Sequence, residues 1–189
     1  MASGMNRMGL LSNPSLPAIF DFASRVCKGA RRWQSARVQI QLVNRQRRVR
    51  LDVRRLAQLA ERSLAECVRH SGDARFALKK LALVEVAVVS DAVIARVHRQ
   101  FMGVPGATDV ITFEHGEIVV SADTAKRCAK EHGHGVIGEL ALYIIHGLLH
   151  LNGWDDIAPR DRARMHRVQD RIWRRVLKAE RPSEGGHSF

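Results

Sequence analysis

Residues 138–156 read GELALYIIHGLLHLNGWDD, and this stretch decides how the rest of the chain must be arranged. Apolar side chains fill most positions up to Leu151, which predicts a helix over about 137–151 that is buried on most of its surface. Gly153 stands where a residue in the left-handed conformation commonly ends a helix. We therefore expect a central helix that is followed at once by a sharp turn.

The segments on either side of this helix alternate between strand and helix patterns. Strands are predicted over 38–42, 83–89, 109–113 and 117–121, and the continuous apolar run at 83–89 indicates a central strand. Further helices are predicted after Asp52, after Ser90, over 122–132 and over 159–179. This order predicts an α+β fold, in which a small mixed sheet of about four strands packs with about five helices.

A single domain is expected, because 189 residues with 46% hydrophobic content suit one compact core. We place this domain at 38–180, between a basic N-terminal extension at 1–37 and a loose tail at 181–189. The extension lacks the apolar centre of a secretory signal, which leaves a basic tail, an upstream extension with the true start at Met5 or Met8, or an organellar transit peptide. No run approaches the ~20 apolar residues of a membrane-spanning helix, so we expect a soluble protein without a membrane partner.

The chain is strongly basic, since 31 Lys and Arg residues face 19 Asp and Glu residues for a net charge of +12. Such a field attracts polyanions and predicts a nucleic-acid partner, although an arginine-rich codon composition would give the same charge. Cys27, Cys67 and Cys128 form no CxxC pair. We therefore expect no disulfide-linked partner, and the cysteine usage fits a reducing cytoplasm.

The central helix carries two histidines with the spacing of metal ligands. His146 and His150 are four residues apart, so both imidazoles project from one face of the helix. The turn at Gly153 can bring Asp155 or Asp156 back toward them. Three protein ligands with one open position are typical of a catalytic metal site, whereas ordinary packed histidines are the alternative. We expect the other histidines to be surface or loop residues: His70, His98, His132, His134, His166 and His187.

The pattern HxxxHxxGxxD also occurs in metallopeptidases, whose first histidine is followed by a glutamate that deprotonates water. Gly147 occupies that position here. A glycine cannot accept a proton, so the sequence disfavours a peptidase while keeping the metal. A phosphodiester substrate fits better, because its cleavage relies on Lewis-acid help and charge neutralisation.

Three motifs together resemble the YbeY family of rRNA-maturation endoribonucleases, and the resemblance spans about 38–156. They are ATDVITF at 107–113, GEIVVS at 116–121 and the stretch at 138–156. The resemblance implies a metal-dependent endoribonuclease that cuts single-stranded RNA, matures the 3′ end of 16S rRNA and acts in ribosome quality control. It implies rRNA and ribosomal particles as partners, and one divalent ion, preferably zinc, as the cofactor.

Two positions depart from the family pattern. The motif usually ends in a third histidine, where this chain has Asp156, so the expected ligands are His146, His150 and Asp156. The family also places an arginine where this chain has Met102, and Arg99 or Arg96 is a candidate to replace it in catalysis. Both departures keep open an alternative function, a non-catalytic RNA- or ribosome-binding assembly factor with a structural metal.

Further roles are assigned by residue type and position. Asp155 is either a catalytic proton acceptor or a capping carboxylate of the turn. Glu139 either orients a metal ligand or is favoured by the helix dipole. RNA phosphates are expected to contact two arginine clusters, unless these are only solvated surface: Arg45, Arg47 and Arg48 in the first, and Arg164, Arg167 and Arg171 in the second.

Overall fold

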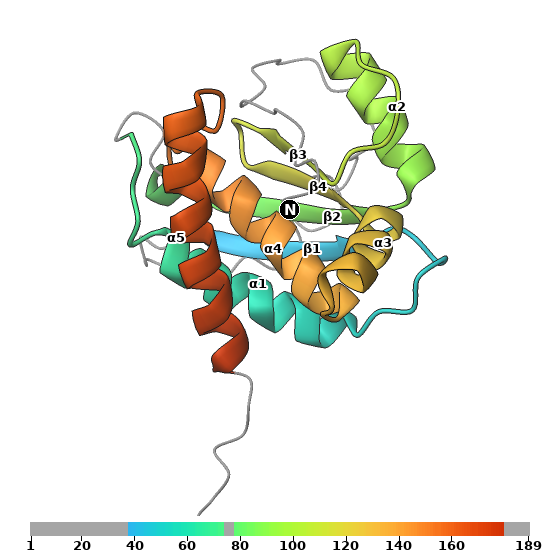
Figure 1. Cartoon of the computed structure of the whole chain (residues 1–189), viewed down its shortest axis with the longest axis horizontal. Helices are drawn as coiled ribbons and strands as arrows, with labels where there is room; N and C mark the ends of the chain where they lie inside the picture. Colours follow the sequence, from blue (N-terminus) through green and yellow to red (C-terminus); the bar gives the residue numbers. More distant parts are fainter. Residues whose placement is uncertain (1–37, 74–77, 180–189) are drawn as a thin grey trace, which may run out of the picture.

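The computed structural model describes residues 38–73 and 78–179 (Figure 1). The predicted basic extension and C-terminal tail lie outside the described residues. Within the described part, a four-stranded sheet and five α-helices confirm the predicted α+β fold.

The sheet contains β1 (Gln39–Asn44), β2 (Leu83–Val89), β3 (Val110–Phe113) and β4 (Glu117–Ser121). The spatial order is β1-β2-β4-β3. The β1–β2 and β2–β4 pairs are parallel, whereas β3 runs antiparallel to β4. The sheet is therefore mixed, and β2 is an inner strand, as its apolar run predicts.

The helices are α1 (Val53–Cys67), α2 (Asp91–Met102), α3 (Ala122–His132), α4 (Val136–Leu151) and α5 (Pro159–Lys178), with a short 3₁₀ turn, η2 (Leu78–Lys80), before β2. Asp52 caps α1 as expected, because its side chain accepts a hydrogen bond from the backbone N–H of Arg55 at 2.9 Å. Ser90 holds the cap position of α2 but makes no side-chain cap bond there. Asp123 of α3 instead accepts from the N–H of Asp91 at 2.9 Å, which ties α2 to α3.

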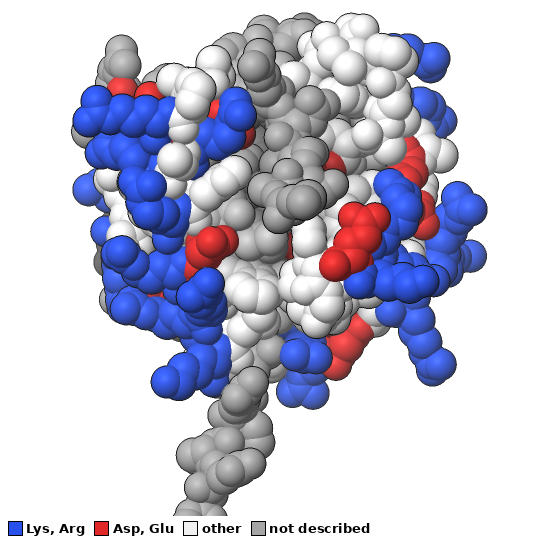
Figure 2. Space-filling model, viewed as in Figure 1, with Lys and Arg blue, Asp and Glu red and all other residues white. Residues whose placement is uncertain are grey.

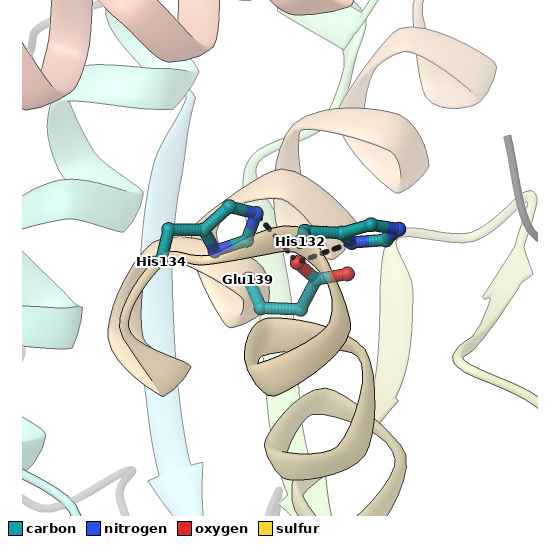
Figure 3. A group of neighbouring side chains, drawn as sticks. All are labelled: His132, His134 and Glu139. Atoms are coloured by element: carbon teal, nitrogen blue, oxygen red, sulfur yellow. Dashed lines mark hydrogen bonds and ion pairs between the residues drawn. The ribbon is translucent and has the colours of Figure 1, made fainter. Parts of the chain in front are cut away.

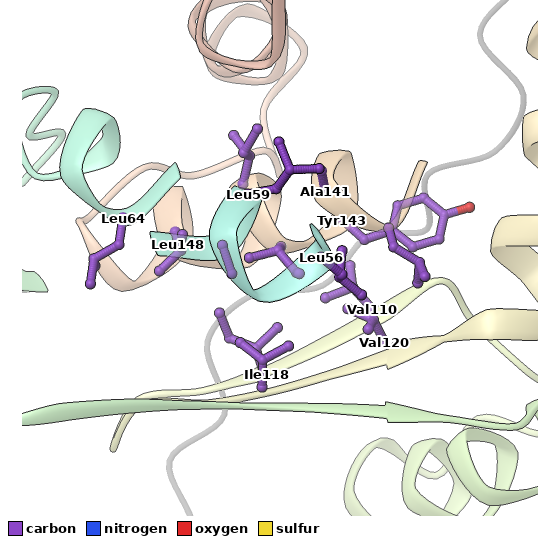
Figure 4. Close-up of a cluster of buried hydrophobic side chains, with 14 of the residues drawn as sticks. Leu56, Leu59, Leu64, Val110, Ile118, Val120, Ala141, Tyr143 and Leu148 are labelled. Atoms are coloured by element: carbon purple, nitrogen blue, oxygen red, sulfur yellow. The ribbon is translucent and has the colours of Figure 1, made fainter. Parts of the chain in front are cut away.

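The two faces of the sheet carry different helices. Alternate side chains of β2 point in opposite directions, so Val86 joins the larger core and Ala87 joins the smaller one. Helices α1, α4 and α5 contribute to the larger core, and α2 covers the opposite face through Ile94 and Val97 (Figures 1 and 4). Helices α1 and α4 both contact strands on this face of the sheet, and α5 packs on these two helices.

Helix α4 is buried along most of its length, as its composition predicts. Gly147 is the position that lets it lie close to the sheet. A Cβ atom at Gly147 would stand 2.8 Å from Thr112 Oγ1 and 3.0 Å from two side-chain carbons of Ile118. The glycine is thus required for the close helix–sheet contact, and a longer side chain at this position would meet the sheet.

No single helix among the described residues is both long and apolar enough to cross a bilayer. Helices α3 and α4 reach the required length and apolar composition only when they are taken together, and they are bent by 112° relative to each other. Cys67 and Cys128 are free thiols. Burial raises the pKa of the Cys67 thiol far above its usual range.

Candidate metal centre

The structure brings the three predicted ligands together at the C-terminal end of α4. His146 Nε2 lies 3.0 Å from His150 Nε2. Asp156 completes the group, with Oδ2 3.7 Å from His146 Nε2 and Oδ1 3.8 Å from His150 Nε2. All three residues are buried. Helical spacing sets the histidine pair, and the turn after the helix supplies the carboxylate.

This turn is held in place by the buried side chain of Asn152. Its Nδ2 donates to the backbone oxygens of Cys67 and His70, both at 2.8 Å. Its Oδ1 accepts from the N–H of Leu78 at 3.0 Å. Trp154 Nε1 also donates to the oxygen of His70 at 2.8 Å. Because these contacts fix the chain just before Asp156, they determine where the carboxylate lies.

The second nitrogen of each imidazole is also engaged. His146 Nδ1 lies 2.8 Å from Oε1 of the buried Gln169, and His150 Nδ1 lies 3.0 Å from the backbone oxygen of Trp154. Both partners are acceptors, so each Nδ1 carries the proton and donates it. This leaves the Nε2 lone pairs directed at each other and at Asp156. Such outer hydrogen bonds fix the tautomer and orientation of histidines that bind metals.

The electrostatics of the group suit a bound cation. Burial lowers the pKa of His146 to about 4, and burial together with the neighbouring His146 lowers the pKa of His150 to about 4. Both rings are therefore neutral at pH 7, which is the form that binds metals. Burial raises the pKa of the Asp156 carboxyl, and its Oδ1 has no hydrogen-bond partner among the described residues. A divalent cation would compensate this buried carboxylate.

The donor separations also fit a small ion. Bonds of about 2.0–2.2 Å in a tetrahedral arrangement place ligand atoms about 3.3 Å apart. The three observed separations, 3.0, 3.7 and 3.8 Å, lie around that value. Two imidazoles with one carboxylate form a donor set that suits zinc and other first-row divalent metals.

Gln169 offers a direct test of the outer hydrogen bond. Replacing it with leucine should weaken divalent-metal binding about 10- to 100-fold, because His146 would lose the acceptor that orients its ring. Gln169→Glu keeps an acceptor at this position and should retain most of the affinity. Competition titration with a chromophoric chelator measures both variants. Equal affinity of Gln169→Leu and the wild type would contradict the assignment.

The other predicted site residues lie outside this group. Asp155 is exposed, and its Oδ1 accepts from the N–H of Ile157 at 2.9 Å, as expected of a turn-capping carboxylate. Arg99 is exposed on α2, which covers the opposite face of the sheet from α4. Within the described ranges, no hydrogen bond or ion pair joins Arg99 to the three ligands. Catalytic roles for Asp155 and Arg99 therefore stay predictions.

The expectation of a surface or loop residue is wrong for His98, whereas His132 is exposed and His134 lies in the turn after α3. His98 is buried, and its Nδ1 lies 3.0 Å from the oxygen of Gly106, where it supports the loop before β3. His132 and His134 both contact the buried carboxylate of Glu139. Glu139 thus contacts His132 and His134 rather than the predicted metal ligands on its own helix. The turn between α3 and α4 places these two histidines beside the Glu139 carboxylate.

The predicted arginine clusters are exposed. Arg45, Arg47 and Arg48 lie between β1 and α1, whereas Arg164, Arg167 and Arg171 lie on α5. Arg164 Nη1 also lies 3.7 Å from Asp161 Oδ1. Their contact with RNA stays a prediction.

Sequence analysis missed a cleft of about 780 Å³ next to the ligand group. Its lining combines residues of α3, α4, α5 and the loop before β3, including Thr108, Arg127, Arg162, His166 and Gln169. No sequence pattern marked this cleft, because its walls come from four separate segments.

Comparison with known proteins gives consistent matches. The Endoribonuclease YbeY family model matches residues 41–177. A Frankia alni protein named Endoribonuclease YbeY is 31% identical over 149 residues, which cover 62% of this chain and 82% of that protein. A Micrococcus luteus protein of the same name is 30% identical over 142 residues, covering 67% and 90%. A solution structure of a Thermotoga maritima protein matches with a TM-score of 0.51 and 26% identity, covering 79% of this chain and 99% of that one.

Other matches are shorter. The Myxococcus xanthus protein of the same name is 37% identical over 102 residues, which cover 47% of this chain and 35% of that protein. The chain therefore spans about a third of the length of that relative.

Proposed function

This chain belongs to the Endoribonuclease YbeY family, and from that membership we propose that it is a metal-dependent endoribonuclease that cuts single-stranded RNA. The observation that carries the proposal is the convergence of His146 Nε2, His150 Nε2 and the Asp156 carboxylate. All three are buried, and a cleft that is large enough for a nucleotide is lined by Gln169, which contacts His146, and by Arg162, which donates to the backbone oxygen of Asp156.

The chain's own residues would hold and shape the reactive centre. His146 and His150 keep their protons on Nδ1, where Gln169 and Trp154 accept the hydrogen bonds, so that each Nε2 keeps its lone pair free to bind a metal ion. When bound, a divalent ion supplies Lewis-acid polarisation of a phosphate oxygen and makes a nearby water more acidic. The apolar surroundings of α4 exclude bulk water from the ligands and strengthen these electrostatic interactions.

Peptide hydrolysis is disfavoured by the position after His146. Gly147 faces Thr112 and Ile118 of the sheet, so a glutamate there would collide with the sheet. A metallopeptidase requires that carboxylate as its proton acceptor. Phosphodiester cleavage can rely instead on Lewis-acid help and charge neutralisation.

Removing the metal tests the proposal directly. Cleavage of a labelled single-stranded RNA should stop with chelator and return when Zn²⁺ or Mn²⁺ is added. The chelator would remove the ion from His146, His150 and Asp156, and the added metal would restore it. A casein digestion should show no proteolysis in either state. Cleavage that continues unchanged in chelator would contradict the proposal, as would casein digestion in place of RNA cleavage.

One observation favours the alternative function of a non-catalytic assembly factor. Met102 stands where the family places an arginine, and it packs against the apolar cluster between α2 and the sheet. A chain that binds RNA but does not cut it, with or without metal, would fit that alternative. The same cleavage experiment, paired with an RNA-binding measurement, separates the two functions.

We extend the proposal to rRNA, to the 3′ end of 16S rRNA and to ribosomal particles, as the resemblance to the family implies, and to the cytoplasm, which the cysteine usage fits. Support comes from the net charge of +12. Figure 2 shows Lys and Arg side chains gathered over α5 on one side, and near α3 and the loop before α1 on the other. This distribution suits a phosphate backbone that crosses the face between them.

The two arginine clusters can be tested by the salt dependence of RNA binding. Changing Arg164, Arg167 and Arg171 to glutamine should lower the slope of log affinity against log salt by about 2, if each contacts a phosphate of a single strand. The same experiment applies to Arg45, Arg47 and Arg48. A control with equal charge loss changes Arg62, Arg69 and Lys79, which we place outside the contact surface. Equal slopes for cluster and control variants would reject the assignment.

A further inference from the structure

A second group of metal-ligating side chains lies at the opposite end of α4 from the first. His132 ends α3, His134 lies in the following turn, and Glu139 lies near the start of α4. Glu139 Oε2 is 3.0 Å from His134 Nε2 and 3.5 Å from His132 Nδ1. Figure 3 shows the two imidazoles directed at this carboxylate.

Two glycines create this arrangement. Gly133 ends α3 with a φ of 72°, and Gly135 holds the N-cap position of α4. The chain turns sharply between them, with a bend of 112° between the helices. This turn places His132 and His134, on either side of Gly133, next to the first turns of α4, where the Glu139 side chain points toward them.

The Glu139 carboxylate is buried against the two imidazoles. Its side chain is only 2% exposed, and its ion pairs within residues 38–73 and 78–179 are with His132 and His134. His134 Nδ1 is also buried, and no hydrogen-bond partner for it lies among these residues. A buried carboxylate costs free energy unless it is paired, and a cation held between its oxygen and the two ring nitrogens would pair it.

We propose that His132, His134 and Glu139 form a second metal site that takes a first-row divalent ion such as Zn²⁺ or Ni²⁺. Two imidazole nitrogens and one carboxylate oxygen suit first-row divalent ions, whereas Mg²⁺ and Ca²⁺ prefer oxygen donors alone. The separations of 3.0 and 3.5 Å suit bonds of about 2.0–2.2 Å to one ion. The His132 side chain is 35% exposed, so the remaining positions open to solvent.

The second site is separate from the first. Glu139 precedes His146 by seven residues on the same helix, which is about 10 Å along the axis. This is too far for one dinuclear centre, whose ions lie about 3.5–4 Å apart. His132 and Glu139 line the same cleft as Gln169, so the ion would add positive charge to the wall of that cleft. The idea that this charge affects RNA binding rests on the proposed function, whereas binding of the ion does not.

Metal stoichiometry tests the proposal. Metal-free full-length protein is titrated with Zn²⁺ by calorimetry, and bound metal is counted by elemental analysis after equilibrium dialysis. The wild type should bind two ions per chain. His134→Ala and Glu139→Gln should each lose one, with affinity for that ion falling more than the 10- to 100-fold typical of an outer-shell change. His150→Ala should keep the ion that these two variants lose.

Controls keep the result interpretable. His115→Ala removes an exposed histidine that pairs with one carboxylate, Glu117, at 3.1 Å, and it should still bind two ions. His132→Ala changes a partly exposed side chain and serves if Glu139→Gln fails to fold. One ion per wild-type chain that His150→Ala loses and His134→Ala keeps would overturn the proposal, as would two ions in His134→Ala. Loss of both ions in His150→Ala, with normal folding, would also overturn it, because the sites would not be independent.

Discussion

Replacing His150 with alanine is expected to abolish both metal retention at the first site and RNA cleavage. His150 Nε2 lies 3.0 Å from His146 Nε2 and 3.8 Å from Asp156 Oδ1, so it is one of the three donors that converge there. Loss of an outer-shell partner already lowers metal affinity about 10- to 100-fold, and loss of a ligand should exceed this. Elemental analysis and a cleavage assay with labelled single-stranded RNA measure the two effects.

The matched control for this variant is His115→Ala, because the His115 side chain is exposed in the turn between β3 and β4. It should cleave RNA at the wild-type rate. Circular dichroism must show that His150→Ala remains folded. A folded His150→Ala protein that still cuts RNA at a rate within a few-fold of the wild type would remove the ligand group from the mechanism.

Local sequence patterns predicted the fold and the histidine pair. The four-residue spacing of His146 and His150 fixes their common face once the segment is helical, and the apolar composition makes it a buried helix. Strand positions followed in the same way from apolar runs bounded by turn residues. In each case the deciding information lies within a few neighbouring residues.

Partners that lie far apart in the sequence could not be predicted. Asn152 bonds to Cys67 and His70, which are 85 and 82 positions away, and Gln169 reaches His146 from 23 positions away. Nothing in the composition around Asn152 or Gln169 marks them as supports of a metal site. Their roles exist only after α1 and α5 have packed against α4.

The second histidine pair illustrates the same limit. His132 and His134 flank a glycine in a short polar turn, which is the usual composition of a solvated loop. Their carboxylate partner belongs to the next helix, and the sharp bend between α3 and α4 alone makes the contact. A sequence pattern gives the turn residues but not the angle at which the next helix leaves.

Replacing Gly153 with alanine is expected to lower the free energy of unfolding by at least about 3 kcal/mol. The residue has a φ of 83°, and a left-handed conformation costs an alanine about 1–2 kcal/mol. A Cβ atom would also stand 2.4 Å from the backbone nitrogen of Asp73, a collision that no rotamer change relieves. Metal affinity should fall as well, because the turn that delivers Asp156 must shift. Urea unfolding and chelator competition measure the two effects.

Gly103→Ala separates the stability lost through the steric collision from the stability lost through the left-handed backbone conformation. Gly103 ends α2 with a φ of 67°, and a Cβ atom there would meet nothing within 4 Å. This variant should lose only the conformational part, about 1–2 kcal/mol, and should bind metal as the wild type does. Equal destabilisation of the two variants would show that the close contact with Asp73 does not hold the turn. In that case the position of Asp156 would depend on the hydrogen bonds of Asn152 and Trp154.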